Sequence, residues 1–378
     1  MIGIDIRFMS ENMKNGTISS GVGLFCADVL KGIVQCKRSA EVVLIADSNQ
    51  FRAAQALFSE YSICKYNRLP RGRLSYVLNS LEEKRFNTFL SNEKINMIWY
   101  PFATPYNFVI SKVFTISTIH DLIPVHESLS PSIKKESYRS VIKNSGGVIT
   151  ISNYVKRDIE DLFPEINKSK IISIPNPVSI DFSTNRSIPE LIGKEYILDL
   201  NAFQERKNIE TLVFAYANSE LIRKCDLVFC GGYNEDSYLE RMKELVAELG
   251  LESRVHFYLA LPIEQRNWLI NNAKMLVSPS VSEGFGRTPV EAMIACKPVI
   301  TSSLPVFLEA TKGLAFYYGD AKDKVSLRER MEYVFNNPPS TVQLNAISSK
   351  ISDCYSSLRI AKQYLSLFDL WGARDGKE

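Results

Sequence analysis

The sequence predicts an α/β protein with two doubly wound, Rossmann-like domains that face each other across a cleft. Three observations support this fold class. The 378 residues are too many for one ordinary core, and they favour two domains. Short apolar runs alternate with helical patterns, as expected for parallel sheets covered by helices. The alternation starts again after a polar, turn-rich stretch that includes 181–189, which we interpret as a linker.

The first series of elements lies in the N-terminal half. Helical patterns over 23–37 and 152–161 alternate with the apolar runs. Residues 1–178 are therefore expected to form the N-terminal domain. The strands predicted for it are 2–8, 42–46, 97–100, 114–119, 147–151 and 171–174.

The second series predicts a C-terminal domain over residues 179–352. Its expected strands are 196–200, 227–230, 255–258, 275–277, 298–301 and 314–317, and its expected helices are 208–218, 236–249, 263–273 and 289–295. A long amphipathic pattern follows over 353–371. We expect 353–378 to form a helix and tail that cross back to the N-terminal domain.

Composition narrows the class of protein. Hydrophobic residues make up 45% and charged residues 23%, which is typical of a soluble globular chain. No run of about 18 apolar residues predicts a membrane span. The N-terminus reads as a strand rather than a signal peptide, so we expect a cytoplasmic protein. The seven cysteines are odd in number and form no Cys-x-x-Cys pair, which favours reduced thiols.

The sequence shows no clear pattern for binding a metal ion or a nucleic acid. Three histidines and the absence of an Asp-x-Asp pair give no obvious metal site. The sequence has no dense stripe of Lys and Arg, which argues against a nucleic-acid partner. The N-terminal half is mildly basic, which suits an anionic acceptor or a membrane surface but also fits ordinary scatter of surface charge.

The most informative segment is the glycine-rich stretch 280–293, which follows a predicted strand and opens a helix. Thr288 and Glu291 have the spacing of a capping box, with Thr288 as the N-cap. A cap does not account for Gly284 and Gly286, which would let backbone N–H groups approach a ligand. The positive end of the helix dipole adds to this attraction. Together these features predict a site for a diphosphate or for sugar hydroxyls.

Two glutamates flank this stretch, Glu283 and Glu291, in a Glu-x7-Glu arrangement. Here the chain resembles the retaining glycosyltransferases of family 4, whose hallmark is this motif and whose fold is GT-B. The resemblance extends over most of the chain. It also covers 118–124, 152–158, 196–208 and 297–300.

The resemblance implies roles for the residues of the glycine-rich stretch. Glu283 would contact the transferred sugar, and Glu291 would hold the ribose hydroxyls of the nucleotide. The remaining donor-binding residues would be Gly284, Phe285, Gly286, Arg287 and Thr288.

Further site residues are implied outside this stretch. Arg206 and Lys207 match a basic pair that stabilises the leaving diphosphate, in line with the need for fixed cations where no metal is used. His120, at the end of a predicted strand, would contact the donor sugar. Gly21 and Gly23 resemble the first glycine loop of the family. Catalytic roles are thus expected for Glu283, His120, Arg206 and Lys207.

The sequence departs from the family pattern at three positions. Asn201 replaces a glycine, which predicts a less open approach for phosphate after the strand 196–200. Pro177 stiffens the turn between the domains. Arg287 replaces an apolar residue, and it is either an extra phosphate or base contact or a surface change.

The expected function is transfer of a sugar, with mannose from GDP-mannose as the first choice, to a growing lipid-linked glycan of a surface polysaccharide such as lipopolysaccharide O-antigen. The N-terminal domain would bind the acceptor and the C-terminal domain the nucleotide-sugar. No cofactor or metal is expected. The basic segments 65–73 and 134–143 would face the cytoplasmic side of a membrane or be ordinary solvated surface.

Some alternatives stay open at this stage. Retention of configuration is compatible with front-face attack, which we favour, or with a covalent enzyme intermediate. A nucleotide-sugar 2-epimerase of the same fold and a non-catalytic subunit that binds glycan or nucleotide-sugar are the competing functions.

Overall fold

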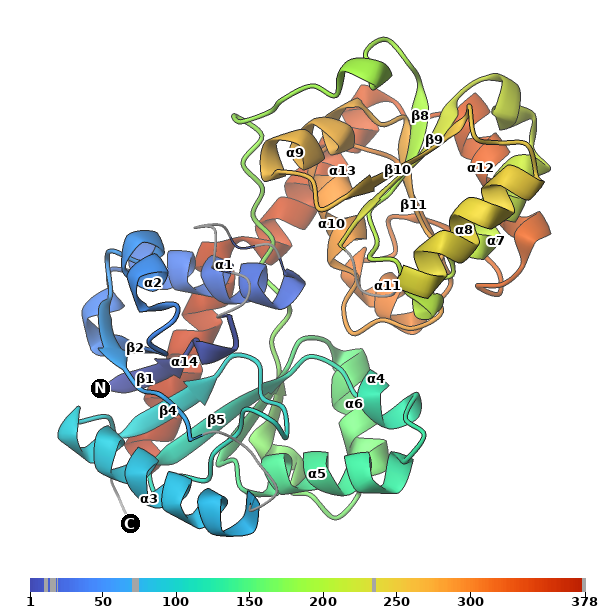
Figure 1. The fold of residues 1–378 in the computed structure, drawn as a ribbon. Coiled ribbons are helices and arrows are strands. Elements are labelled where there is room, and N and C mark those ends of the chain that lie inside the picture. Colours follow the sequence, from blue (N-terminus) through green and yellow to red (C-terminus); the bar gives the residue numbers. More distant parts are fainter. Residues whose placement is uncertain (10–12, 14–17, 19, 70–74, 233–235, 376–378) are drawn as a thin grey trace. The chain divides into compact units, whose positions relative to one another are not determined.

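The computed structural model describes all residues except 10–12, 14–17, 19, 70–74, 233–235 and 376–378. The chain divides into two compact units (Figure 1). Unit 1 comprises Met1–Pro177 with Tyr355–Glu378, and unit 2 comprises Val178–Cys354.

Unit 1 is built on a parallel sheet with the strand order β3-β2-β1-β4-β5-β6-β7. The strands are short and mostly buried, which explains why they read as apolar runs. Their bounds are β1 (Ile2–Asp5), β2 (Val42–Ala46), β3 (Ser62–Lys65), β4 (Met97–Tyr100), β5 (Phe114–Ile119), β6 (Gly147–Thr150) and β7 (Ile171–Ser173).

Helices cover the sheet of unit 1. They are α1 (Gly21–Gln35), α2 (Phe51–Leu57), α3 (Ser75–Asn92), α4 (Ile123–His126), α5 (Pro131–Lys143), α6 (Asn153–Leu162) and α14 (Ser357–Asp375), with short 3₁₀ turns at Arg7–Met9, Ser39–Glu41 and Lys168–Lys170.

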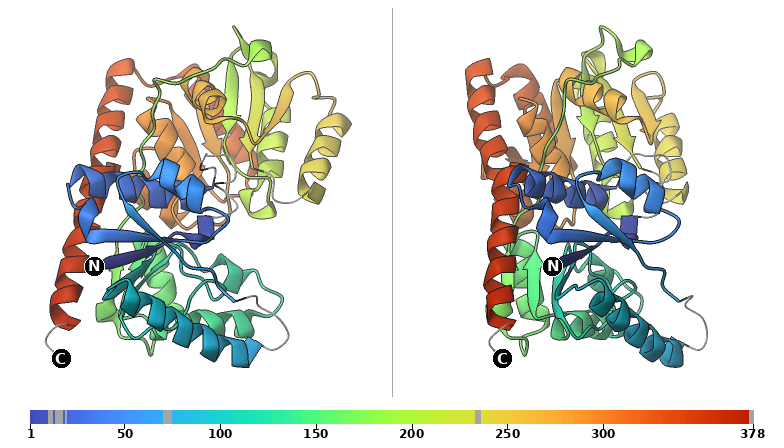
Figure 2. Two further views of the ribbon diagram at one scale, coloured as in Figure 1. Left: turned by 60° about the vertical axis from the view of Figure 1, so that its left-hand side comes forward. Right: turned by 90° about the vertical axis from the view of Figure 1, so that its left-hand side faces the viewer.

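The last helix, α14, belongs to the core of unit 1 although it ends the chain. It runs beside α1 in both views of Figure 2. Tyr364, Phe368 and Trp371 are buried in the same hydrophobic cluster as Phe25 and Trp99. Gly32 of α1 permits this packing, because a Cβ there would overlap the carbonyl oxygen of Ser357.

Unit 2 repeats the architecture with the strand order β10-β9-β8-β11-β12-β13, again parallel. Its strands are β8 (Tyr196–Asp199), β9 (Asp226–Gly231), β10 (Val255–Leu259), β11 (Met275–Ser278), β12 (Val299–Ser302) and β13 (Phe316–Tyr318). Its helices are α7 (Ile209–Ala217), α8 (Asp236–Glu248), α9 (Ile263–Asn272), α10 (Arg287–Ile294), α11 (Pro305–Ala310), α12 (Lys324–Asn336) and α13 (Thr341–Tyr355), with 3₁₀ turns at Pro189–Leu191, Glu205–Lys207 and Glu220–Arg223.

The predicted fold class, two Rossmann-like parallel-sheet domains, is confirmed. Several details differ. The first strand ends at Asp5 rather than residue 8, because Arg7–Met9 turns into a 3₁₀ helix. The amphipathic pattern over 353–371 comprises the end of α13 and the separate helix α14. The sequence analysis did not single out β3, α3 or α5.

Candidate functional site

The predicted donor-binding residues of unit 2 lie near the point where the strand order of its sheet reverses. From β8 the chain moves to β9 on one side of the sheet, and it returns to β11 on the other side. The loops that follow β8 and β11 therefore leave from neighbouring strand ends. In doubly wound sheets, ligands bind at this switch point. The backbone N–H of Val281 donates to the carbonyl of Arg206 (2.9 Å), which joins the two loops.

Glu283 is held by both predicted cations. Lys207 donates to Glu283 Oε1, and Arg206 Nη1 lies 3.4 Å from Oε2. The Ser280 hydroxyl donates to Oε1 at 3.0 Å. Burial alone would raise the pKa of Glu283, but Lys207 and Arg206 outweigh it and lower the pKa. Glu283 is thus a fixed carboxylate, and the three side chains together carry net positive charge.

Arg206 and Lys207 are placed by the turn that leads into α7. They lie in the 3₁₀ turn Glu205–Lys207, and Asn208 follows in the left-handed conformation (φ 55°). Two hydrogen bonds from its side-chain amide fix Asn208, because Nδ2 donates to the carbonyls of Pro279 (3.0 Å) and Ala321 (2.7 Å). This anchoring directs Lys207 into a largely buried position beside Glu283.

Glu291 is clamped between two arginines. Arg287 Nε donates to Oε1 at 2.9 Å, and Arg266 Nη2 donates to Oε2. The glutamate is only 1% exposed. Burial would raise its pKa, but Arg266 and Arg287 lower it on balance. Arg266, on α9, was missed by the sequence analysis because no local pattern links it to a residue 25 positions later.

The predicted capping box is wrong. Helix α10 begins at Arg287, and the N-cap is Gly286 with φ 90° and no side-chain cap bond. Thr288 therefore lies inside the first turn, and the Glu291 carboxylate binds arginines instead. Two features favour glycine at position 286. Its backbone is left-handed, and the ring of Phe307 lies 2.8 Å from where a Cβ would stand.

The loop before α10 is tightly packed. Gly284, Phe285 and Gly286 are all buried, so the glycines serve close packing as well as any ligand approach. Since α10 starts directly after them, its positive dipole end is directed at this loop.

Asp199 and Asn201 form a buried pair at the end of β8 that the sequence analysis did not treat as a site. Asp199 accepts from the backbone N–H of Asn201 (3.0 Å) and from its Nδ2 (2.8 Å). Burial raises the pKa of Asp199 to about 7, partly offset by these bonds. Because the Asn201 side chain turns inward, it stabilises the loop that leads to Arg206.

In unit 1, His120 directly follows β5 and is buried. Its ring lies edge-on to Phe25, with the centroids 4.8 Å apart. Nε2 lies 2.8 Å from the carbonyl of Pro101, so Nε2 carries the proton and Nδ1 is the acceptor. Burial lowers the pKa of His120 to about 4, and the imidazole is neutral at physiological pH.

The sequence analysis predicted a glycine loop at Gly21 and Gly23, and this prediction is wrong. Both lie in the first turn of α1, whose N-cap Ser20 accepts from the N–H of Gly23 at 3.0 Å. A Cβ at Gly23 would come within 2.7 Å of Ile18, whereas Gly21 has open space. Their proposed role in binding remains a prediction, now at a helix N-terminus.

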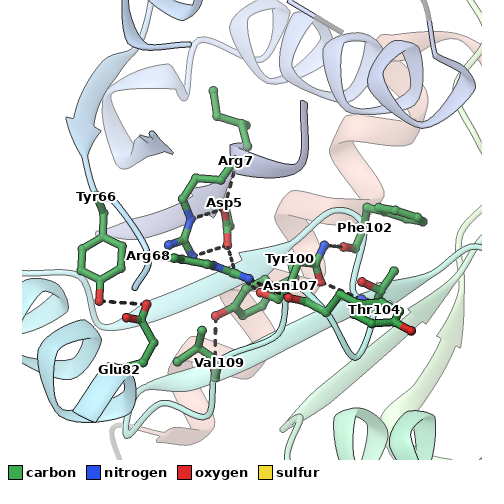
Figure 3. Close-up of polar contacts among 12 residues, drawn as sticks. Asp5, Arg7, Tyr66, Arg68, Glu82, Tyr100, Phe102, Thr104, Asn107 and Val109 are labelled. Atoms are coloured by element: carbon green, nitrogen blue, oxygen red, sulfur yellow. Dashed lines mark hydrogen bonds and ion pairs between the residues drawn. The ribbon is translucent and has the colours of Figure 1, made fainter. Parts of the chain in front are cut away.

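A second buried ionic cluster lies at the switch point of unit 1, between β1 and β4 (Figure 3). Arg7 binds Asp5 through Nε (2.9 Å) and Nη2 (2.7 Å), and its guanidinium lies over the ring of Tyr66. Arg68 Nη2 lies 3.4 Å from the same carboxylate and also donates to the carbonyl of Asn107. Burial would raise the pKa of Asp5, but Arg7 and Arg68 lower it on balance.

This cluster connects segments that are far apart in the sequence. Asp5 ends β1, and its carboxylate also accepts from the backbone N–H of Arg7 at 3.1 Å. Asp199 makes the same bond at the end of β8, the first strand of unit 2. Each unit thus has an aspartate that fixes the turn at its switch point.

The described part of the chain shows neither a metal-ligand cluster nor a membrane-spanning helix. No three His, Cys, Asp or Glu side chains in these ranges are grouped so as to hold a metal ion. Within the same residues, no helix combines the length and apolar character needed to cross a bilayer.

Family models match both halves of the chain. Residues 19–182 match the model described as Glycosyltransferase Family 4, and residues 182–350 match Glycosyl transferases group 1. The two matches together cover most of the sequence. The N-terminal half is thus similar to family 4 and the C-terminal half to group 1. Both models describe glycosyltransferases, and the chain is therefore a glycosyltransferase, the enzyme class that the two flanking glutamates had predicted.

Curated relatives of this glycosyltransferase include mannosyltransferases. It is 29% identical over 215 residues to the O-antigen chain mannosyltransferase RfbU of Salmonella typhimurium, which covers 55% of this chain and 57% of RfbU. It is 29% identical over 197 residues to the alpha-1,3/1,6-mannosyltransferase ALG2 of Dictyostelium discoideum, covering 48% and 44%. The serotype-specific mannosyltransferase WbdA of Escherichia coli is 29% identical over 201 residues, covering 47% and 24%. The matches thus span 57% of RfbU and less than half of the other two relatives.

Solved structures show that the fold of this glycosyltransferase is shared over nearly its full length. A glycosyltransferase from Rickettsia africae ESF-5 has a TM-score of 0.74 at 16% identity, covering 98% of each chain. Anabaena Alr3699/HepE in complex with UDP and glucose has a TM-score of 0.72 at 15% identity, covering 97% and 99%. WaaG, a glycosyltransferase involved in lipopolysaccharide biosynthesis, has a TM-score of 0.69 at 13% identity, covering 97% and 99%. These likenesses confirm the GT-B fold.

Proposed function

We propose that this enzyme is a retaining mannosyltransferase that transfers mannose from GDP-mannose to a growing, lipid-linked glycan. The pairing of Glu283 with Lys207 and Arg206, at the switch point of unit 2, carries the proposal. RfbU, ALG2 and WbdA are mannosyltransferases, which supports mannose as the sugar. RfbU and WbdA also support a surface polysaccharide as the product.

Leaving-group stabilisation would come from Arg206 and Lys207. In the reaction the bond between the anomeric carbon and the phosphate oxygen breaks, and its electron pair stays on the nucleotide diphosphate. The two cations would take up the negative charge that develops there. Since they now contact Glu283, a bound diphosphate would compete for them and leave carboxylate oxygens for sugar hydroxyls.

Front-face attack fits the surroundings of Glu283 better than a covalent intermediate. With the cations turned to the diphosphate, Oε1 would still accept a hydrogen bond from Ser280 and the carboxylate would accept others from sugar hydroxyls, which suits binding better than nucleophilic attack. The acceptor hydroxyl would form the new bond on the face from which the diphosphate departs. Its proton would pass to the departing phosphate oxygen.

The other predicted residues would bind and orient the donor. Glu291, kept ionised by Arg266 and Arg287, would accept bonds from the ribose hydroxyls. Neutral His120 would accept a bond from a sugar hydroxyl through Nδ1, and with its lowered pKa it would not serve as a cation. We also propose that catalysis needs no metal ion.

A donor screen tests the proposal. Purified protein is offered GDP-, UDP- and dTDP-sugars, and thermal stabilisation and product release are followed with a lipid-linked acceptor. Stabilisation and transfer with GDP-mannose are expected, with activity retained in EDTA. Interconversion of the free nucleotide-sugar would indicate a 2-epimerase, and stabilisation without turnover on any acceptor would indicate a binding subunit. Either result contradicts the proposal, and loss of activity in EDTA would overturn its metal-free part.

A further inference from the structure

Arg266 reaches Glu291 from a separate helix and uses only part of its guanidinium to do so. It lies in the first half of α9, and its Nη2 donates to Oε2 of Glu291 on α10. Among the described residues, the Arg266 guanidinium makes no other hydrogen bond, so Nε, Nη1 and the second proton of Nη2 remain available. The Arg266 side chain is 21% exposed, whereas that of Glu291 is 2% exposed. Arg266 therefore presents a fork of N–H donors to a ligand that binds beside Glu291.

Neutralising Glu291 does not account for Arg266. Arg287 already binds the same carboxylate through Nε at 2.9 Å, and one guanidinium balances one carboxylate. The two arginines and the glutamate together carry one net positive charge. The second guanidinium is thus an additional donor group at the ribose end of the candidate site.

The backbone that carries Arg266 is firmly held. The neighbouring side chain of Asn267 is buried, and its Nδ2 donates to the carbonyl of Asp181 at 2.8 Å. One half-turn further along α9, the carbonyl of Leu269 accepts from the hydroxyl of Tyr196 at 2.8 Å. With Glu291 holding its other end, the arginine side chain is fixed at both ends, as a residue that reads the shape of a ligand must be.

The order of groups in a nucleotide diphosphate directs the base toward Arg266. The proposed function places the diphosphate at the two cations before α7 and the ribose at Glu291. Because the ribose joins the diphosphate to the base, the base extends beyond Glu291 on the side away from these cations. Arg287 directly follows the glycine-rich loop, whereas Arg266 lies toward the carboxyl end of β9. Burial raises the pKa of the Cys230 thiol on that strand to about 11, and the charge of Arg266 partly offsets the rise.

A guanidinium fork with free N–H groups distinguishes guanine from the pyrimidines. Guanine carries two adjacent acceptors, O6 and N7, which an arginine can bind together. Uracil and thymine have no such pair, because O4 is next to the N3–H donor, which a cation does not accept. A fixed arginine at the base therefore favours a guanine nucleotide over a uracil or thymine nucleotide.

We propose that Arg266 is the residue that selects a guanine nucleotide, by donating two hydrogen bonds to O6 and N7 of the base while it keeps its bond to Glu291. The inference rests on the proposed function, because it takes the ribose to lie at Glu291. It adds to that function the group that reads the base, and it explains why a second arginine is present at a carboxylate that one arginine already neutralises.

Nucleotide analogues test the proposal on the unaltered protein. Titration calorimetry with wild-type protein should show that UDP binds at least about tenfold more weakly than GDP. Inosine diphosphate, which keeps O6 and N7 but lacks the 2-amino group, should bind like GDP. The analogue 7-deaza-GDP, in which carbon replaces N7, should bind about fivefold or more weakly than GDP. These three results together would locate recognition at the O6 and N7 edge.

A pair of matched variants tests the residue. Arg266→Lys keeps a positive charge beside Glu291 but removes the fork, so GDP affinity should fall at least about tenfold and UDP affinity much less. The preference for GDP should then largely disappear. Arg287→Lys alters the other arginine at Glu291 and is the matched control. It should lower the affinity for both nucleotides by a similar factor and keep the wild-type preference, a ratio that a merely structural role of Arg266 would also leave unchanged.

The outcomes separate this inference from the proposed function. Binding of 7-deaza-GDP that equals that of GDP, or an Arg266→Lys protein that keeps the wild-type preference, overturns the role of Arg266 and leaves GDP-mannose as the proposed donor. Wild-type protein that binds UDP as tightly as GDP contradicts the proposed donor itself, and the role of Arg266 falls with it. The analogue measurements need no variant, so they decide even if Arg266→Lys does not fold.

Discussion

At the scale of single residues, Lys207 is the most specific test of the site. Lys207→Ala should lower turnover at least about tenfold, because one of two cations facing the departing diphosphate is lost. The measurement is kcat with saturating donor and acceptor. Lys224→Ala, which removes an exposed lysine paired with Glu220, is the matched control and should be neutral. Wild-type turnover in the Lys207 variant would remove the basis of the proposed mechanism.

Glu291 tests donor binding separately from turnover. Glu291→Gln keeps an oxygen that accepts a bond but loses the charge between Arg266 and Arg287. Donor affinity, measured by titration calorimetry, should fall at least about tenfold. Glu291→Ala should do the same and also destabilise the fold by roughly 2–4 kcal/mol, because two partly buried guanidiniums lose their partner. A folded Gln variant with unchanged affinity would contradict the ribose role.

Asp199 makes a prediction about pH. Its pKa is raised to about 7 in the folded chain, above the ordinary value of 3.8, so the folded state holds the proton more tightly. Its contribution to stability is full below about pH 4 and is lost as the pH rises through about 7. Asp199→Asn should flatten this fall, which is on the order of 2–4 kcal/mol. Urea unfolding of both proteins between pH 4 and 8 measures how the free energy of unfolding changes with pH. The same pH dependence in wild type and variant would show that Asp199 is ionised throughout.

At the scale of elements, the sequence predicted strands more reliably than helix ends. Strands such as Val42–Ala46 are buried along their whole length, so a bare apolar run marks them. The start of α10 was misjudged because Thr288 and Glu291 imitate a capping box, while the left-handed backbone of Gly286 sets the true boundary. The strand Ser62–Lys65 was missed because both of its end residues are exposed and none of its residues is fully buried, so no apolar run marks it.

The contact between α1 and α14 gives a test at this scale. Gly32→Ala would place a Cβ against the carbonyl of Ser357 and the side chain of Ala361, and it should destabilise the protein by about 1–3 kcal/mol. Helix propensity alone predicts the opposite sign. Gly21→Ala, in the same helix with open space around it, is the matched control and should be neutral or stabilising. The denaturant midpoints of unfolding of both variants and wild type measure these effects. A stabilised Gly32→Ala variant would rule out the close approach of the helices.

At the scale of the whole molecule, the sequence predicted the loops of the candidate site but not how their side chains are paired. The Glu-x7-Glu spacing identified Glu283 and Glu291 because both lie in one short segment. Arg266 and the link from Arg68 to Asp5 join distant segments, and no local pattern reports such pairs. Pairing of this kind is fixed by tertiary packing, so it became visible only in the folded chain.

The C-terminal helix makes a final prediction about the two units. Removing residues 355–378 would take Tyr364, Phe368 and Trp371 out of the core of unit 1, a loss far larger than the about 3–5 kcal/mol of a single aromatic truncation. Unit 2 has its own hydrophobic cluster, built entirely within residues 197–334. Hydrogen exchange on the shortened chain should therefore show lost protection in β1, β2 and β4 but retained protection in β8, β9 and β11. Trp371→Ala should weaken unit 1 without unfolding it. Protection that survives in β1 and β4 after the truncation would mean that unit 1 completes its core without α14.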